Sequence, residues 1–525
     1  MTRKANKNIH FYGGVNEIGG NKILVDTNDS SKSSKSSNSS NSSQNNLSSL
    51  FLDFGMSFSA AGSYFSEFLQ PRKLNGIMDF VELGLLPKIK GIYREDYLKH
   101  CGINSNEEPA IDGVLLSHAH MDHSAYIHHL REDIPIFMRK ESEIILKVLE
   151  ETGKASFAEI MNLKKSFHYV PKKRGEGYKR LTGNDAKVKR EIITVDPYSP
   201  FEINGFKVTS IPVDHSLPGS SSYFLESDNE AIVYTGDIRF HGRNKEFSDK
   251  FVKKAYKFNP TTMLCEGTRI NESSKGLEED IETKATELIN NHNGLAIVNY
   301  PIRDLDRLIT FYNVAKSTDR ILAINTKQAY MLKLLEEDGD IEQGKYPSLN
   351  DEKIAIYFPR KKQGLISGEH YVCYDDDWKI LNHEDEEVKK DYETWEREFL
   401  EEGNVLNYRD LQENPNSYIF RCDFFELKEL IDIKPKNGLY IHSMTEPFNE
   451  EMEIDFRRVQ NWLKHFNLLP MHSMHVSGHA SGDEIINMIK EINPENLYPI
   501  HTTNIESFDV LRDYGIEVVY PELKL

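Results

Sequence analysis

The stretch Gly113–His123, which reads Gly-Val-Leu-Leu-Ser-His-Ala-His-Met-Asp-His, decides the fold and the chemistry expected of this chain. Its apolar start predicts a short buried strand, and four side chains that can bind metal ions follow within six positions. Because side chains two residues apart in an extended segment point the same way, His118, His120 and Asp122 can converge, with His123 directly after them. Such ligands suit Zn²⁺, or Mn²⁺ where oxygen atoms dominate. The alternative, a polar loop that is merely rich in histidine, is disfavoured by this spacing after an apolar strand.

Length and composition describe a soluble globular protein. At 525 residues the chain is too long for one compact core, which predicts two domains. No apolar run approaches the roughly 20 residues of a membrane span, and the N-terminal residues lack the apolar core of a signal peptide. We therefore expect a cytoplasmic protein that does not bind membranes. The four cysteines are far apart without a Cys-x-x-Cys pair, which argues against disulfides and cysteine zinc sites.

The net charge of −19 argues against a surface covered with basic patches, although it does not exclude a local basic groove. Residues 164–190 are the basic exception, because ten Lys or Arg residues stand there against Glu176 and Asp185, with His168 and Tyr178 interleaved. This segment predicts either a loop that grips phosphate beside the site or, as the slightly favoured interpretation, a solvated surface hairpin.

Strand-like segments at 9–12, 21–26 and 50–55 precede the central motif. The Ser- and Asn-rich stretch 29–49 between them has the composition of a disordered loop. Asp53 ends one of these strands, where it either supports the metal loop through hydrogen bonds or caps a turn.

Further apolar strands also end at side chains that bind metals. The strand at 208–213 leads to His215, and the strand at 231–236 leads to Asp237. Each signal is weak alone, but in this order after the central motif they are strong. Beyond Thr268, helical and strand patterns alternate, which predicts a parallel-sheet α/β domain. The acidic segment 375–402 predicts an exposed helix without chemistry.

The central motif resembles the signature of metallo-β-lactamase-fold hydrolases, and later motifs resemble those of β-CASP nucleases, nearest to ribonuclease J. Three of these later motifs match in order: Glu266 in Leu-Cys-Glu-Gly-Thr-Arg, His479 in Ser-Gly-His-Ala, and His501 in Pro-Ile-His. The long interval between Asp237 and His475 fits the inserted domain of that family. The resemblance implies an α/β fold, in which 1–267 and 471–525 form a metallo-β-lactamase αββα sandwich and 268–470 form an inserted α/β β-CASP domain.

The resemblance also implies two Zn²⁺ ions per chain, with Mn²⁺ or Mg²⁺ as alternatives. One ion would be held by His118, His120 and His215. The second would be held by Asp122, His123 and His501, with Asp237 bridging both. A pair of ions about 4 Å apart can clamp the attacking and leaving oxygens of a phosphodiester.

Catalytic roles are implied for Asp122, Glu266 and His479. His479, oriented by Glu266, would stabilise charge on the scissile phosphate or protonate the leaving oxygen. Ser477 and the backbone at Gly478 would bind a substrate phosphate together with His479.

A histidine at position 501 is typical of the RNA-processing branch of the family. The implied function is therefore hydrolysis of RNA, by exonuclease or endonuclease action, in RNA processing or decay. The chain ends 24 residues after His501, as in archaeal-type members, and residues 441–448 depart from the phosphate-binding stretch of ribonuclease J. One alternative is a hydrolase of DNA or another phosphodiester. The other is a non-catalytic paralogue from an RNA-processing complex, which the complete set of seven ligands disfavours. A homodimer and partner proteins stay open.

Overall fold

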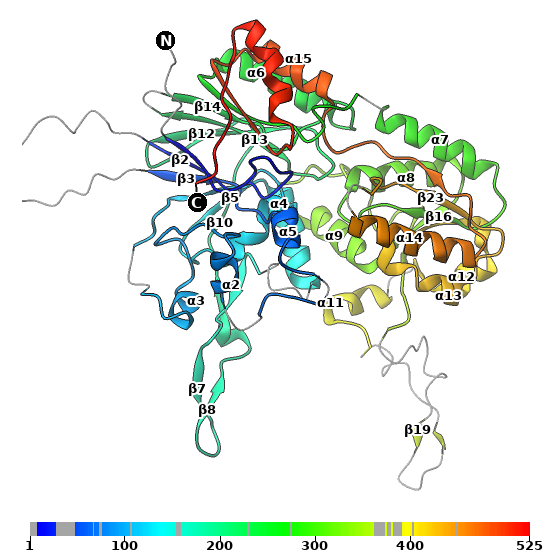
Figure 1. Ribbon diagram of the computed structural model, residues 1–525. Helices are drawn as coiled ribbons and strands as arrows, with labels where there is room; N and C mark the ends of the chain where they lie inside the picture. The colour runs from blue at the N-terminus through cyan, green and yellow to red at the C-terminus, as the bar shows by residue number, and fades with distance from the viewer. Residues whose placement is uncertain are drawn as a thin grey trace, which may run out of the picture. The chain divides into compact units, whose positions relative to one another are not determined.

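The computed structural model describes residues 8–27, 48–66, 68–72, 76–104, 108–153, 159–227, 230–273, 276–361, 373–374, 380–381, 391–401, 404–447 and 450–524 (Figure 1). The chain divides into two compact units, namely Met1–Ser274 with Gly478–Leu525, and Lys275–Ser477. The corresponding boundaries expected from the sequence lie at 268 and 471.

The first unit contains two sheets. One has six strands in the order β1 (Ile9–Phe11), β2 (Ile23–Asp26), β3 (Ser49–Leu52), β4 (Gly113–Leu115), β5 (Ile136–Met138) and β10 (Ile192–Thr194). The first three strands are antiparallel, whereas β3, β4, β5 and β10 run parallel. Parallel strands end at the same edge of a sheet, so the segments that follow β3 and β4 lie together.

The second sheet has seven strands in the order β11 (Pro200–Ile203), β12 (Phe206–Pro212), β13 (Ser221–Ser227), β14 (Glu230–Tyr234), β15 (Thr262–Glu266), β25 (Asn496–Ile500) and β26 (Glu517–Val518). From β11 to β14 neighbouring strands are antiparallel, and from β14 to β26 they are parallel. Strands β12, β14, β15 and β25 therefore all run in the same direction.

Apolar packing turns these sheets into a layered core. Side chains from both sheets form one cluster, including Val25 and Leu115 from the first sheet and Val208 and Leu264 from the second. A second cluster joins the other face of the second sheet to α6 (Lys245–Phe258), α15 (Gly482–Ile492) and the 3₁₀ segment Ile505–Tyr514. Helix α5 (Lys140–Thr152) contacts β10 of the first sheet. The α/β sandwich expected from the sequence is confirmed.

The basic segment of the first unit forms two consecutive antiparallel ladders between α5 and β10. Strand β6 (Asn162–Lys164) pairs with β9 (Lys187–Lys189), and β7 (Tyr169–Pro171) pairs with β8 (Tyr178–Arg180). Figure 1 shows that the β7–β8 hairpin projects from the rest of this unit. The segment is therefore a hairpin at the surface of this unit.

The second unit has a seven-stranded parallel sheet in the order β21 (Val405–Leu406), β18 (Ile354–Tyr357), β17 (Ile321–Asn325), β22 (Tyr418–Arg421), β16 (Ala296–Asn299), β23 (Leu439–His442) and β24 (His472–Ser473). Its helices are α7 (Glu278–Asn290), α8 (Leu305–Ser317), α9 (Thr326–Glu337), α12 (Tyr408–Glu413), α13 (Glu429–Ile433) and α14 (Glu450–His465). The expected parallel α/β domain is confirmed.

Two local expectations need correction or restriction. The loop expected at 29–49 lies outside the described residues except at its end, where Ser49 begins β3 and its hydroxyl donates to Asp26. The acidic segment 375–402 is only partly described, and a single exposed helix is wrong there. Its described part holds a strand at Ile380–Leu381 and the short helix α11 (Thr394–Arg397), whose Glu396 is buried because it binds Thr326 and Lys361.

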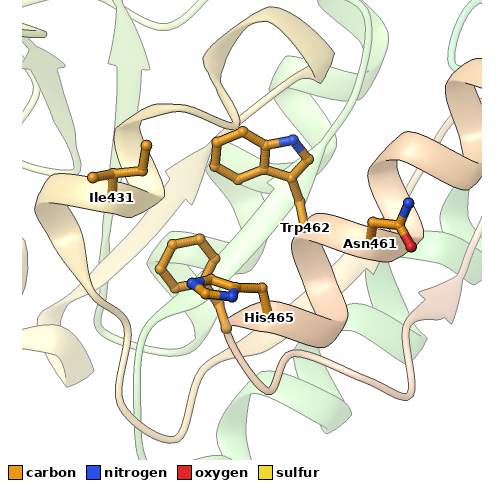
Figure 2. Close-up of a pocket in the computed structure, with 5 residues that line it drawn as sticks. Ile431, Asn461, Trp462 and His465 are labelled. Carbon is orange, nitrogen blue, oxygen red and sulfur yellow. The ribbon is translucent and has the colours of Figure 1, made fainter.

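The second unit also carries a small surface pocket of about 280 Å³ between α13 and α14, lined by Ile431, Asn461, Trp462, His465 and Phe466 (Figure 2). None of the ligand candidates contributes to it.

Among the residues that the structure describes, no helix is both long and apolar enough to cross a bilayer.

Candidate metal centre

Strand direction explains why distant parts of the chain meet at this site. In the second sheet, β12, β14 and β25 run the same way and are followed by His215, Asp237 and His501, while β15 ends at Glu266. In the first sheet, β4 is followed by the loop that carries the motif histidines, and α4 (Met121–Ser124) begins within the motif. Helix α4 ends at Ser124, and Ala125–His129 continue as a 3₁₀ helix.

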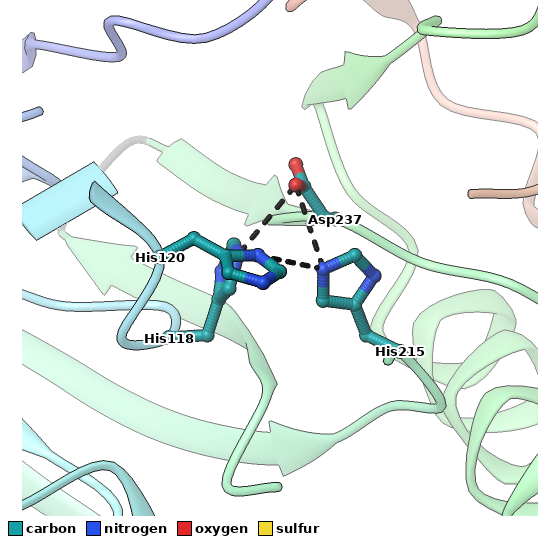
Figure 3. A group of neighbouring side chains, drawn as sticks. All are labelled: His118, His120, His215 and Asp237. Atoms are coloured by element: carbon teal, nitrogen blue, oxygen red, sulfur yellow. Dashed lines mark hydrogen bonds and ion pairs between the residues drawn. The ribbon is translucent and has the colours of Figure 1, made fainter. Parts of the chain in front are cut away.

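The first group of potential ligands consists of His118, His120, His215 and Asp237 (Figure 3). Nδ1 of His120 lies 2.9 Å from Nε2 of His118 and 3.2 Å from Nε2 of His215. Oδ2 of Asp237 lies 3.5 Å from Nε2 of His118 and 3.8 Å from Nε2 of His215. Ligands on a tetrahedral Zn²⁺ are separated by about 3.3 Å, since Zn–N bonds measure about 2.0–2.1 Å. These spacings therefore fit one metal ion.

The second group consists of Asp122, His123 and His501. Oδ2 of Asp122 lies 3.7 Å from Nε2 of His123 and 3.3 Å from Nε2 of His501. Asp237 reaches this group as well, because its Oδ2 lies 3.2 Å from Nε2 of His123 and its Oδ1 lies 3.8 Å from Nε2 of His501. Asp237 is thus the carboxylate that both groups share, and all seven predicted ligands come together.

The orientation of the rings also suits a metal. Nδ1 of His118, His123, His215 and His501 each lies within hydrogen-bonding distance of an oxygen atom, so Nε2 of each ring faces the centre. His120 is the exception and directs Nδ1 inward. The buried Nε2 of His123 and Oδ1 of Asp237 have no hydrogen-bond partner among the described residues. A cation between the ligands would satisfy both atoms.

The electrostatics of the two groups agree with this fit. Burial, together with neighbouring histidines, holds the pKa of His118 and His215 well below the ordinary value, so both are neutral ligands at pH 7. Burial also lowers the pKa of His123 and His501, but the carboxylates of Asp237 and Asp122 outweigh it and raise both. This carboxylate-rich part of the site thus favours a positive charge.

Asp53 supports the central motif from the end of β3. Its Oδ1 accepts from the backbone N–H of Ser117 at 2.6 Å, and its Oδ2 accepts from the Ser117 hydroxyl and from Nδ1 of His123, both at 2.7 Å. The hydroxyl of Tyr234 also donates to Oδ2. Asp53 therefore orients the ligand loop, and its side chain does more than cap a turn.

The other histidines are oriented by groups that the sequence analysis did not single out. Nδ1 of His215 donates to the carbonyl oxygen of Gly478 at 2.6 Å. Nδ1 of His501 lies 2.8 Å from the Thr268 hydroxyl, which in turn donates to Glu266 at 2.7 Å. A lone threonine carries no sequence signal for this role, because its partners lie far away in the chain.

The loop around Asp122 is held by the backbone of two glycine-containing turns. The N–H groups of Gly20 and Asn21 donate to the Asp122 carbonyl oxygen at 3.0 and 3.2 Å. A Cβ atom at Gly55 would lie 1.7 Å from that same oxygen, so only glycine fits there. The buried ammonium of Lys22 joins the two turns by donating to the carbonyl oxygens of Gly20 and Gly55.

Glu266 and His479 form a third group with Asp237. Nδ1 of His479 lies 2.9 Å from Oε2 of Glu266, and Glu266 also accepts from the backbone N–H of Ile238 at 2.7 Å. Burial lowers the pKa of His479, but the carboxylates of Glu266 and Asp237 outweigh it and raise it to about 9. The His479 side chain is 21% exposed, whereas that of Glu266 is 1% exposed. His479 is therefore the member of the pair that a substrate can reach.

The two remaining predicted residues, Ser477 and Gly478, lie where the chain passes from the second unit back to the first. Gly478 is where the chain re-enters the first unit, and its carbonyl oxygen binds His215. A Cβ atom at this position would lie 2.8 Å from the Ser216 hydroxyl. The absence of a side chain at Gly478 therefore lets its backbone lie close to Ser216 and His215. Ser477 is half-buried and is the last residue of the second unit.

Comparison with protein families matches two parts of the chain. Residues 98–272 match the beta-lactamase superfamily domain, and residues 467–521 match the Zn-dependent metallo-hydrolase RNA specificity domain. The probable RNase MJ4 of Methanocaldococcus jannaschii is 22% identical over 426 residues, which cover 78% of this chain and 85% of that protein. The endoribonuclease YSH1 of Candida albicans is 26% identical over 162 residues, which cover 30% of this chain and 17% of that protein.

A crystal structure of a protein of unknown function from Enterococcus faecalis V583 superimposes with a TM-score of 0.65 at 21% identity, covering 98% of this chain and 97% of that one. At that identity the likeness concerns the fold alone. Taken with the family matches, the chain carries a metallo-β-lactamase domain and an RNA-specificity domain and is homologous to RNase MJ4 and the endoribonuclease YSH1, which is consistent with a β-CASP ribonuclease.

Proposed function

We propose that this protein is a two-metal phosphodiester hydrolase whose substrate is RNA. The observation that carries the proposal is the arrangement of two ligand groups around one shared carboxylate, Asp237, beside the Glu266–His479 pair. The names of the two curated relatives and the RNA-specificity match support RNA as the substrate.

In this proposal one ion would be held by His118, His120 and His215, a second would be held by Asp122, His123 and His501, and Asp237 would serve both. Imidazole and carboxylate ligands at these spacings favour Zn²⁺. When bound, such a pair stabilises charge on phosphate oxygens and activates water. The four buried histidine rings are oriented by hydrogen bonds, so the ligands need little rearrangement to bind metal.

The protein's own residues then position and protonate the substrate. The Asp122 carboxylate, whose side chain is 18% exposed, can accept a hydrogen bond from the attacking water. His479 donates a hydrogen bond or a proton to the scissile phosphate or its leaving oxygen, and Glu266 holds the ring by Nδ1. Ser477 and Gly478 precede His479 in the chain, which leads us to include them in phosphate binding.

The proposal is tested with zinc-loaded protein and end-labelled single strands of one sequence, as RNA and as DNA, each with a 5′-monophosphate or a 5′-hydroxyl. Internal cuts in RNA would identify an endonuclease. Mononucleotide products released faster from the 5′-monophosphate would identify an exonuclease of the ribonuclease J type. Asp237→Ala protein is the control and should cleave neither.

Cleavage of DNA alone would overturn the assignment of RNA as the substrate. Cleavage of neither strand by fully metal-loaded protein would overturn the proposed hydrolase activity and favour a non-catalytic paralogue.

A further inference from the structure

We infer that the double hairpin at 162–189 is a basic arm that binds an unpaired RNA strand outside the metal centre. The basic arm comprises β6, β7, β8, β9 and the residues between them. This inference rests on the proposed RNA substrate, but none of the candidate ligands belongs to the arm. It adds a binding surface that the catalytic residues do not explain.

The arm concentrates positive charge in an acidic protein. The chain carries a net charge of −19, whereas eight of the Lys and Arg residues between 164 and 190 are exposed on the arm. Arg190 is not one of them, because it is buried and its guanidinium donates to the Leu130 carbonyl oxygen. The arm is therefore the place where electrostatics would direct a polyanion.

Most of this charge forms no ion pair with the part of the chain that the structure describes. Lys164 pairs with Glu159 at 2.8 Å. Among the described residues, no carboxylate forms an ion pair with the other exposed cations, which are Lys172, Lys173, Arg174, Lys179, Arg180, Lys187 and Lys189. Phosphate groups of a bound strand would complement these charges.

Strand register places like charges against one another on the β6–β9 ladder. Lys164 lies directly opposite Lys187, and Lys189 lies two positions along on the same side. The opposite side carries Leu163, which is buried, so the lysines face outward. Like charges directly across a ladder destabilise it, and Glu159 neutralises only Lys164 of the three lysines on this side. An anionic partner would remove the repulsion.

The β7–β8 hairpin adds an aromatic face. Tyr169 lies opposite Arg180, and Pro171 lies opposite Tyr178, so all four side chains share one side of the ribbon. Tyr169 and Tyr178 are 61% and 69% exposed. Exposed aromatic rings between cations are the features that stack unpaired bases while the cations follow the backbone. The RNA-specificity match and the names of the two relatives favour an RNA strand over an acidic protein as the occupant.

The test measures binding, so that it does not depend on cleavage. Fluorescence anisotropy would follow an unstructured 25-nucleotide RNA and its duplex in chelator-containing buffer at several salt concentrations. The charge variant is Lys172→Glu with Lys173→Glu, and its matched control is Lys253→Glu with Lys257→Glu on helix α6 of the same unit. Both pairs are exposed and change the net charge equally.

We expect the Lys172 and Lys173 variant to bind the single strand about tenfold more weakly or worse and to reduce the salt slope by about 1.4, since each phosphate contact contributes about 0.7. The Lys253 and Lys257 control should change neither quantity appreciably. An equal loss in both variants, or an unchanged salt slope in the arm variant, would overturn the inference.

Stacking is tested separately with Tyr169→Ala and Tyr178→Ala combined. Single-strand affinity should fall about tenfold at an unchanged salt slope, while duplex affinity should not change, because paired bases cannot stack on the rings. Equal effects on both forms, or none, would overturn the choice of an unpaired strand. If wild-type, metal-loaded protein binds RNA through the arm but does not cleave it, the proposed hydrolase activity is contradicted and the inference about the arm is not.

Discussion

Asp53 and His123, 70 residues apart in the chain, are joined by a 2.7 Å hydrogen bond between Oδ2 and Nδ1, and both side chains are fully buried. The bond turns Nε2 of His123 toward Asp237, 3.2 Å away. Asp53 also binds the backbone and hydroxyl of Ser117, so one carboxylate fixes both the loop and a ligand ring.

Asp53→Asn should therefore weaken metal binding by about 10- to 100-fold without removing a ligand, as is typical for groups that orient metal-binding histidines. Competition with a chromophoric chelator would measure the dissociation constants. Asp112→Asn is the matched control, because Asp112 likewise accepts from a serine hydroxyl, that of Ser48, and from a backbone N–H, that of Ser49. Equal metal affinity in both variants would show that Asp53 does not orient the ligands.

Asp237 and His215 should differ in how many ions depend on them. His215 contacts only the first ligand group, so His215→Ala is expected to lower the metal content from about two ions per chain to about one. Asp237 reaches both groups, so Asp237→Ala should lower occupancy of both. Elemental analysis of dialysed protein gives the stoichiometry, with His10→Gln as a control outside the site. Two retained ions in Asp237→Ala would rule out a shared ligand.

His479→Gln should keep both metals but lower kcat by about 10²- to 10⁴-fold, since its role is to donate to the substrate. Glu266→Gln should act in the same direction, because the carboxylate holds the His479 ring by Nδ1. The effects of substituting residues that act as a unit are not additive. Adding Glu266→Gln to His479→Gln should therefore lower kcat little further. Full multiplicative loss in the double variant would contradict their coupling.

Stability of the second unit should depend on pH through Glu429. Burial raises the pKa of Glu429 from 4.5 to about 7, and the Tyr357 hydroxyl donates to its carboxylate at 3.0 Å. Because the folded-state pKa lies above the unfolded value, the folded state binds the proton more tightly. The stabilisation is complete below about pH 4.5 and is lost as the pH rises through 7.

Glu429→Gln should remove this dependence, since the amide keeps an acceptor for Tyr357 but carries no charge. One pKa unit corresponds to about 1.4 kcal/mol. Between pH 4 and pH 8, the free energy of unfolding of the variant should therefore rise by roughly 3 kcal/mol relative to that of the wild type. Urea unfolding followed by tryptophan fluorescence reports this unit, because all three tryptophans, Trp378, Trp395 and Trp462, lie within it. The exposed Glu287→Gln is the control, and a similar pH profile in wild type and Glu429→Gln would contradict the prediction.

Much of the fold was predictable because local patterns identify its strands. The apolar runs before His118, His215, Asp237 and His501 form β4, β12, β14 and β25, each ending next to a ligand. Strand propensity and spacing are local properties, so they can be read without knowing how strands pair. The acidic segment 375–402 was mispredicted because its composition is charged, yet Glu396 is buried by partners that lie 35 and 70 residues away.

The sequence by itself determined the ligand types and the order of the strands that carry them. Only the tertiary structure decided that β12, β14, β15 and β25 end at one edge, that Asp237 is shared by both ligand groups, and that Thr268, Gly478 and Lys22 orient or support the ligand loops. It also decided that Tyr169, Tyr178 and Arg180 share one side of the basic arm. The reason is physical, because strand direction and pairing register set which distant residues meet, and neither is encoded in the spacing of neighbouring residues.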